Sequence, residues 1–166
     1  MFSRKLLIIT SLVVFLLSLT IARNMAYARP SPTYGGAIFG AGSDDVSTTT
    51  LFWGRYITDK FAVENAFIDM GDFSHGKGMD DIAFDLSLLV LKRVGESAEI
   101  YFKGGLHIWN LDDDTGEESS SYLIGLGVNK SFGQKLGGRL EWIRYHSFED
   151  DVENIGILNL GLYTKF

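Results

Sequence analysis

The feature that most limits how this chain can fold is an alternation of apolar and polar residues. From Tyr34 onward no window sustains apolar residues at helical spacing, whereas the two-residue period of a β-strand recurs between turn signals. The expected strands are residues 33–43, 47–57, 61–72, 80–92, 98–110, 120–131, 136–147 and 155–166. The sequence therefore predicts an all-β protein with eight strands.

The alternation separates an apolar face from a polar face. In the fourth segment Phe84, Leu86 and Leu88 share one face, while Asp85 and Ser87 lie on the other. Two architectures give this pattern: a soluble sandwich turns the apolar face inward, and a membrane barrel turns it outward to lipid. Periodicity alone does not distinguish them.

Three further features favour the barrel. The polar faces combine Gly, Ser and Asn with isolated charges, which suits a narrow lumen filled by side chains. Strands of about 9–11 residues match the length that a tilted strand needs to cross a bilayer. Short, partly basic connections alternate with acidic ones such as 112–118 and 149–153, as expected for two different rims. We therefore expect an eight-stranded antiparallel up-and-down transmembrane β-barrel. The isolated charges are Glu64, Asp85, Lys103, Arg139 and Glu141.

The first residues have the character of a signal peptide. Arg4 and Lys5 precede the apolar run 6–17, and Ala26 and Ala28 form a small-x-small cleavage site. We expect a signal peptide at 1–28 and a barrel domain at 29–166. A retained transmembrane anchor is the alternative, since the run approaches spanning length. An exported β-barrel is expected in the bacterial cell outer membrane.

Composition excludes several classes of function. The chain has no cysteine, which removes disulfides, thiolate metal sites and cysteine nucleophiles. Its net charge is −6, and the chain becomes more acidic once the three basic residues of 1–28 are removed. Since no basic cluster is present, we expect no nucleic-acid partner.

Several stretches resemble the OmpA-like small outer-membrane β-barrel family, in the branch without a peptidoglycan-binding domain. The resemblance covers nearly all of residues 33–166 and is most specific at 51–64, where a short turn is followed by Glu64, and at 67–71. A second stretch, 128–142, is similar to the sixth-to-seventh strand turn of the family. The C-terminal residues Asn159, Gly161 and Phe166 resemble the signal read by the barrel assembly machinery, from which Thr164 departs because an apolar residue is usual there.

The resemblance also implies an ion-pair network inside the barrel. The matching positions are Glu64 and Arg139, with Glu141 nearby, and Asn129 stands where the family often has a second glutamate. The partner of Lys103 is then Glu64, Asp85, Glu99 or Glu141. Charges in a narrow lumen are costly unless paired, so structural filling of the barrel is the preferred interpretation over transport.

The second strand allows two orientations. Either Leu51, Trp53 and Arg55 face lipid, with Arg55 extending to the interface, or Phe52 and Tyr56 do. The resemblance favours the first orientation.

Catalysis and metal binding have weak candidates. A lipid A hydrolase would need His146, Ser147 and Glu149 together, but adjacent strand residues point to opposite faces, so His146 is poorly placed to take the Ser147 proton. His75 and His107 are isolated histidines, and the acidic run 112–118 lacks the spacing of an EF-hand. This run is either a solvated loop or a bridge through divalent cations to lipopolysaccharide phosphates.

These observations predict a non-catalytic outer-membrane protein without a cofactor and with a structural, envelope-integrity or surface-interaction role. The alternatives are a lipid A-modifying enzyme and a narrow, low-conductance pore. Outer-membrane lipids and lipopolysaccharide are the expected constant partners, and the barrel assembly machinery and periplasmic chaperones are the expected transient ones.

Overall fold

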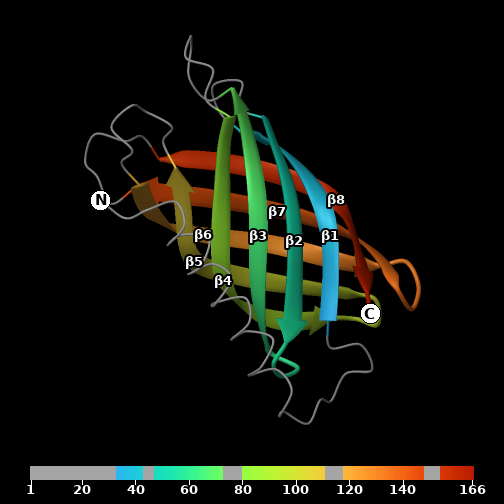
Figure 1. Ribbon diagram of the computed structural model, residues 1–166. Coiled ribbons are helices and arrows are strands. Elements are labelled where there is room, and N and C mark those ends of the chain that lie inside the picture. Colours follow the sequence, from blue (N-terminus) through green and yellow to red (C-terminus); the bar gives the residue numbers. More distant parts are fainter. Residues whose placement is uncertain (1–32, 43–46, 73–79, 111–117, 148–153) are drawn as a thin grey trace.

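The protein is a closed antiparallel barrel in which each strand pairs with the next and β1 pairs with β8 (Figure 1). The computed structural model describes residues 33–42, 47–72, 80–110, 118–147 and 154–166. Within these residues no helix is long and apolar enough to cross a membrane. The strands are β1 (Thr33–Gly42), β2 (Ser47–Tyr56), β3 (Phe61–Asp72), β4 (Asp80–Val94), β5 (Ala98–Asn110), β6 (Glu118–Ser131), β7 (Leu136–Ser147) and β8 (Ile155–Lys165).

The expected all-β, eight-stranded barrel is confirmed, and the strand boundaries differ by two residues at most. β4 runs to Val94 instead of residue 92, because Val94 still pairs with Ala98. The tight connection that follows contains Gly95 at φ 69°, a conformation that other residues rarely adopt. The proposed signal peptide, residues 1–28, lies outside the described residues.

Apolar side chains cover the outside of the barrel. Leu51, Leu126 and Leu160 are 57%, 56% and 65% exposed, whereas Phe52 and Tyr56 are buried inside. The first orientation expected for the second strand is thus the observed one. The outer face is apolar and exposed, and charged and polar side chains are buried inside among apolar ones. An exposed apolar wall is the arrangement that a lipid bilayer requires.

Inside the barrel, three buried tyrosines lie over glycines of neighbouring strands. Tyr34 pairs with Gly54, Tyr101 with Gly127 and Tyr163 with Gly137. A Cβ at Gly127 would lie 2.2 Å from the Tyr101 ring, and the other two glycines are equally crowded. These positions need glycine because the ring occupies the space of a side chain.

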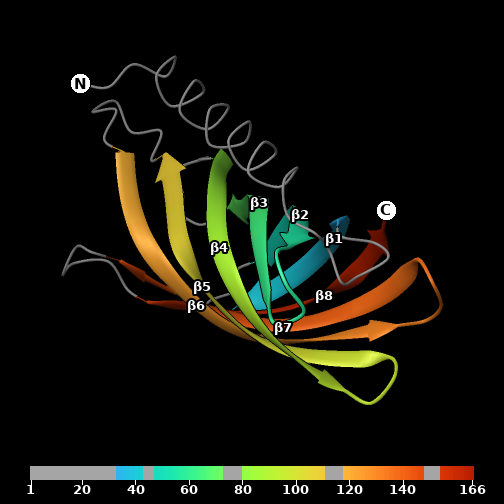
Figure 2. The same cartoon turned by 90° about the horizontal axis from the view of Figure 1, so that it is seen from below.

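The two ends of the barrel differ. Short connections at 57–60, 95–97 and 132–135 lie at the end where β1 begins and β8 finishes. Figures 1 and 2 show the β4–β5 and β6–β7 turns projecting side by side at this end. The strand ends at the opposite rim lead into the segments outside the described residues. We refer to the first end as the short-turn end.

Candidate functional site in the barrel lumen

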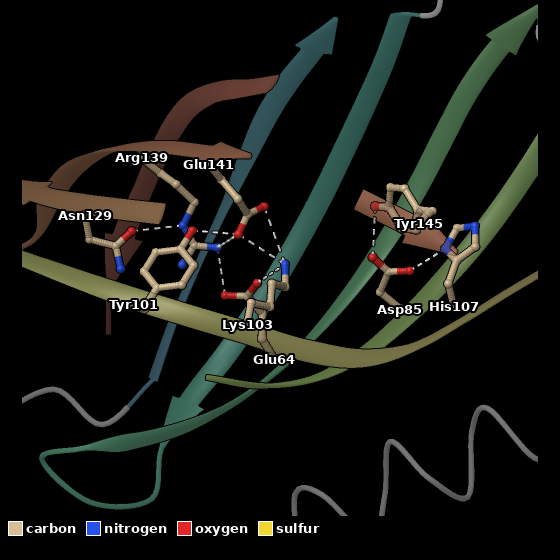
Figure 3. A network of polar contacts seen from close by, with 9 residues as sticks. All are labelled: Glu64, Asp85, Tyr101, Lys103, His107, Asn129, Arg139, Glu141 and Tyr145. Atoms are coloured by element: carbon tan, nitrogen blue, oxygen red, sulfur yellow. Dashed lines mark hydrogen bonds and ion pairs between the residues drawn. The ribbon is translucent and has the colours of Figure 1, made fainter. Parts of the chain in front are cut away.

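Charged and polar side chains from β3 to β7 meet in the middle of the lumen (Figure 3). The strand period places them there, since every second residue points inward. All six of the lumen residues expected from the sequence are 3% exposed or less: Glu64, Asp85, Lys103, Asn129, Arg139 and Glu141.

Glu64 is the centre of the larger group of contacts. Arg139 Nη1 lies 2.8 Å from Glu64 Oε2, and Lys103 Nζ lies 2.9 Å from Glu64 Oε1. Since Glu64 is on β3, Lys103 on β5 and Arg139 on β7, these ion pairs cross the lumen and join strands that are not neighbours.

Glu141 supplies the second carboxylate. Its Oε2 lies 3.3 Å from Lys103 Nζ and accepts a hydrogen bond of 2.6 Å from the Tyr101 hydroxyl. Lys103 therefore contacts two of its four expected partners, Glu64 and Glu141. Two carboxylates and two cations balance in this group, which we call the central network: Glu64, Lys103, Arg139 and Glu141.

Arg139 is held by an amide and by aromatic rings as well as by carboxylates. Its Nε donates a hydrogen bond of 2.9 Å to Asn129 Oδ1. Its Cζ lies 4.0 Å from the centroid of the Phe52 ring and 5.1 Å from that of Tyr101, within the range of cation–π contacts. A neutral amide at 129 accepts a hydrogen bond from the guanidinium without adding a third negative charge.

Asp85 lies in a second, separate cluster. One of its oxygens contacts His107 Nδ1 at 2.5 Å, and the other accepts a hydrogen bond of 3.2 Å from the Tyr145 hydroxyl. The His107 and Tyr145 rings also contact each other, with centroids 4.4 Å apart. The sequence grouped Asp85 with the other lumen charges, whereas Figure 3 shows two clusters side by side.

The sequence places Tyr101 and His107 on the lumen-facing side of their strand, but it did not identify these residues or Tyr145 as partners of the lumen charges. Tyr101 and His107 have the same parity as Lys103 on their strand, and all three point inward, so strand parity was the available signal. Tyr145 shares the inward parity of Arg139 and Glu141. Parity shows that a side chain points inward, but it does not show which atoms meet.

A cavity of about 750 Å³ occupies the short-turn end of the lumen. Its lining includes Lys135, Lys165 and, toward the barrel interior, Tyr56, Glu99 and Asn129. Glu99 accepts hydrogen bonds from the Tyr56 hydroxyl at 2.9 Å and from Asn129 Nδ2 at 3.4 Å. Because Asn129 also contacts Arg139, this layer connects the cavity to the central network.

The three residues of the expected assembly signal lie at the barrel seam or its end. Asn159 is buried, and its Oδ1 accepts a 3.4 Å hydrogen bond from Thr48. Gly161 pairs with Ile38 of β1, and Phe166 is 70% exposed beyond the end of β8. Whether these residues act as an assembly signal stays a prediction.

His146 lies on the outer face and stacks on Tyr122, with ring centroids 4.8 Å apart and planes 2° apart. The Ser147 side chain, Glu149, His75 and the run 112–117 lie outside the described residues. Among the described side chains, no group of three His, Asp or Glu residues has the geometry to hold a metal ion.

Searches against family models and against curated proteins found no match. Solved structures do match. The N-terminal β-barrel domain of Pseudomonas aeruginosa OprF aligns with a TM-score of 0.67 at 15% identity, over 82% of this chain and 98% of that domain. A de novo designed transmembrane β-barrel aligns with a TM-score of 0.62 at 11% identity, over 83% and 98%.

The outer membrane protein Ail of Yersinia pestis also aligns, with a TM-score of 0.55 at 12% identity, over 82% of this chain and 99% of Ail. At these identities the alignments indicate a shared fold and not a shared activity. They agree with the closed eight-stranded topology. The chain has the fold of the small eight-stranded outer-membrane β-barrels.

Proposed function

We propose that the chain is an integral outer-membrane protein that stabilises the envelope or contacts other molecules at the surface, without catalysing a reaction. The observation behind this proposal is the central network, whose ion pairs join β3, β5 and β7 across the lumen. Eight strands enclose an interior just wide enough for side chains. A lumen crossed by buried ion pairs is suited to holding the wall together and poorly suited to passing solutes.

Lipopolysaccharide is the proposed partner at the rim opposite the short turns. The connections at that rim contain acidic runs, among them 112–114 and 149–151. Carboxylates next to an anionic headgroup layer need screening or bridging by divalent cations. Assembly factors would act earlier, on the unfolded chain and on the C-terminal residues of β8.

A narrow pore is the second candidate, favoured by the 750 Å³ cavity that enters the lumen from the short-turn end. In this alternative the layer of Tyr56, Glu99 and Asn129 and the central network behind it form the constriction. A lipid A hydrolase receives less support, because His146 stacks against Tyr122 on the outer wall.

The test is to express the whole chain in a Gram-negative host and to purify it from the outer-membrane fraction. We expect the unboiled protein to migrate differently from the boiled protein on a gel, as a detergent-resistant barrel does. We also expect no steady conductance in planar bilayers. Unchanged lipid A mass spectra in the host would agree with a non-catalytic role. Steady single-channel currents would favour the pore, and recovery as a soluble periplasmic protein would refute the proposal.

A further inference from the structure

The outer wall of the barrel has a hollow that begins near the short-turn end of β4 and extends to Leu158 of β8. A groove of about 500 Å³ crosses β4 to β8, within the size range of small-molecule sites. It is lined almost entirely by apolar side chains that are 40–56% exposed: Val90, Ile100, Phe102, Leu126, Val128 and Leu140. We call this feature the wall groove.

Two lysines stand beside the wall groove. Lys92 lines it and pairs with Ile100, one of its apolar residues. Lys130 pairs with Ala98 on the other side of β5 and follows the lining residue Val128 by two positions. Both lysines point to the outside of the barrel. They lie within two residues of the short-turn ends of β4 and β6.

The spacing allows the two lysines to act together. One strand separates them, and their partners on β5, Ile100 and Ala98, are two residues apart. Two strand spacings across the sheet and a two-residue rise along it place their backbones about 12 Å apart. The small Ala98 leaves room between two long, flexible side chains. Lys130 Nζ donates a 2.9 Å hydrogen bond to Ser97, and among the described residues no carboxylate lies within 4 Å of either ammonium group.

Nearby charges do not neutralise this pair. Arg93 faces Asp59 of the adjacent turn at 3.7 Å, Glu99 is buried inside the barrel, and Glu96 is an exposed residue of the turn at the mouth of the inner cavity. The outer surface therefore has two cations at the end of an apolar groove that form no ion pair with the described residues. That combination matches a phospholipid, whose phosphate is anionic and whose acyl chains are apolar.

We propose that the wall groove, with Lys92 and Lys130, is a binding site for an anionic glycerophospholipid. The phosphate lies between the two ammonium groups, and one acyl chain lies along the apolar lining. This inference rests on the proposed function, because the site exists only if the wall faces a bilayer. In an outer membrane with the short turns in the periplasm, the lipid belongs to the inner leaflet.

The test measures lipid retention by native mass spectrometry on the chain purified from membranes, in detergent, with added dimyristoylphosphatidylglycerol. The Lys92→Gln/Lys130→Gln variant should bind about 10-fold to 30-fold more weakly than the wild type, on the scale of two lysines at an anionic membrane surface. The matched control, Lys135→Gln/Lys165→Gln, removes the same charge from the same end of the barrel at two lysines that line the inner cavity and not the groove, and should retain the lipid.

A third variant tests the contribution of the groove to lipid binding separately from that of the lysine charges. Val128→Trp fills the groove and keeps both lysines, so it should also reduce retention, and dimyristoylphosphatidylcholine should bind the wild type more weakly than the anionic lipid. Equal retention by all variants, or an equal loss in the control, overturns the site. When the variants still show the heat-dependent gel shift, such a result refutes the lipid site and leaves the proposed barrel standing.

Discussion

Replacing Glu64 by glutamine tests whether the lumen charges form one balanced unit. Glu64 contacts Arg139 at 2.8 Å and Lys103 at 2.9 Å, and the three side chains are at most 3% exposed. In Glu64→Gln, two cations would face the single carboxylate of Glu141. Removing one partner of a buried ion pair costs about 3–5 kcal/mol. We expect the free energy of unfolding to fall by about this amount.

The double variant Glu64→Gln/Lys103→Met removes one charge of each sign. It leaves Arg139 and Glu141, whose Nη1 and Oε2 atoms are 4.0 Å apart, as a neutral pair. We expect the double variant to lose clearly less stability than the sum of the two single variants, with a coupling energy of about 2–3 kcal/mol.

Urea titration in lipid vesicles measures these losses through tryptophan fluorescence, with the heat-dependent gel shift as a second probe. Asp59→Asn is the matched control, since its ion pair with Arg93 is more than half exposed on both sides. An exposed pair contributes at most about 1 kcal/mol. Additive losses in the double variant, or a Glu64→Gln loss no larger than that of Asp59→Asn, would refute the reasoning.

Three other substitutions test separate parts of the barrel. Gly127→Ala places a Cβ 2.2 Å from the Tyr101 ring and should destabilise by about 1–3 kcal/mol in urea titration, whereas Gly104→Ala, whose Cβ would lie 3.9 Å from the nearest atom, on the Phe102 ring, should be nearly neutral. Asp85→Ala removes the acceptor of two buried side chains and should cost at least about 1–3 kcal/mol in the same assay; a neutral result would mean that the second cluster does not support the wall. Leu160→Arg puts a charge on the lipid face at the centre of β8 and should cost about 2–4 kcal/mol in vesicles; unchanged stability would contradict a bilayer-facing wall.

The wall of the barrel was predictable because strand parity is a local property. Phe84, Asp85 and Leu86 alternate in the sequence, and the same alternation separates the two faces in the structure. Even the second strand, where both faces carry aromatic residues, follows the orientation suggested by the family resemblance.

The contacts inside the lumen were less predictable because they depend on the relative heights of strands that are far apart in the sequence. Lys103 on β5 had four candidate carboxylates, all with inward parity. Strand tilt and register bring Glu64 of β3 and Glu141 of β7 to its height. The same register pairs Asp85 with His107, which places this carboxylate in the second cluster.

The positions of the two carboxylates support the proposed closed lumen over a gate. Glu64 on β3 and Glu141 on β7 lie four strands apart in an eight-stranded ring, so they belong to opposite walls. Lys103 contacts both, and Arg139 contacts Glu64 while packing on the Phe52 ring. Breaking one ion pair leaves the walls joined through the others, whereas opening the lumen requires several buried contacts to break together. The energetic cost of that concerted step favours a closed barrel whose central network stabilises the wall.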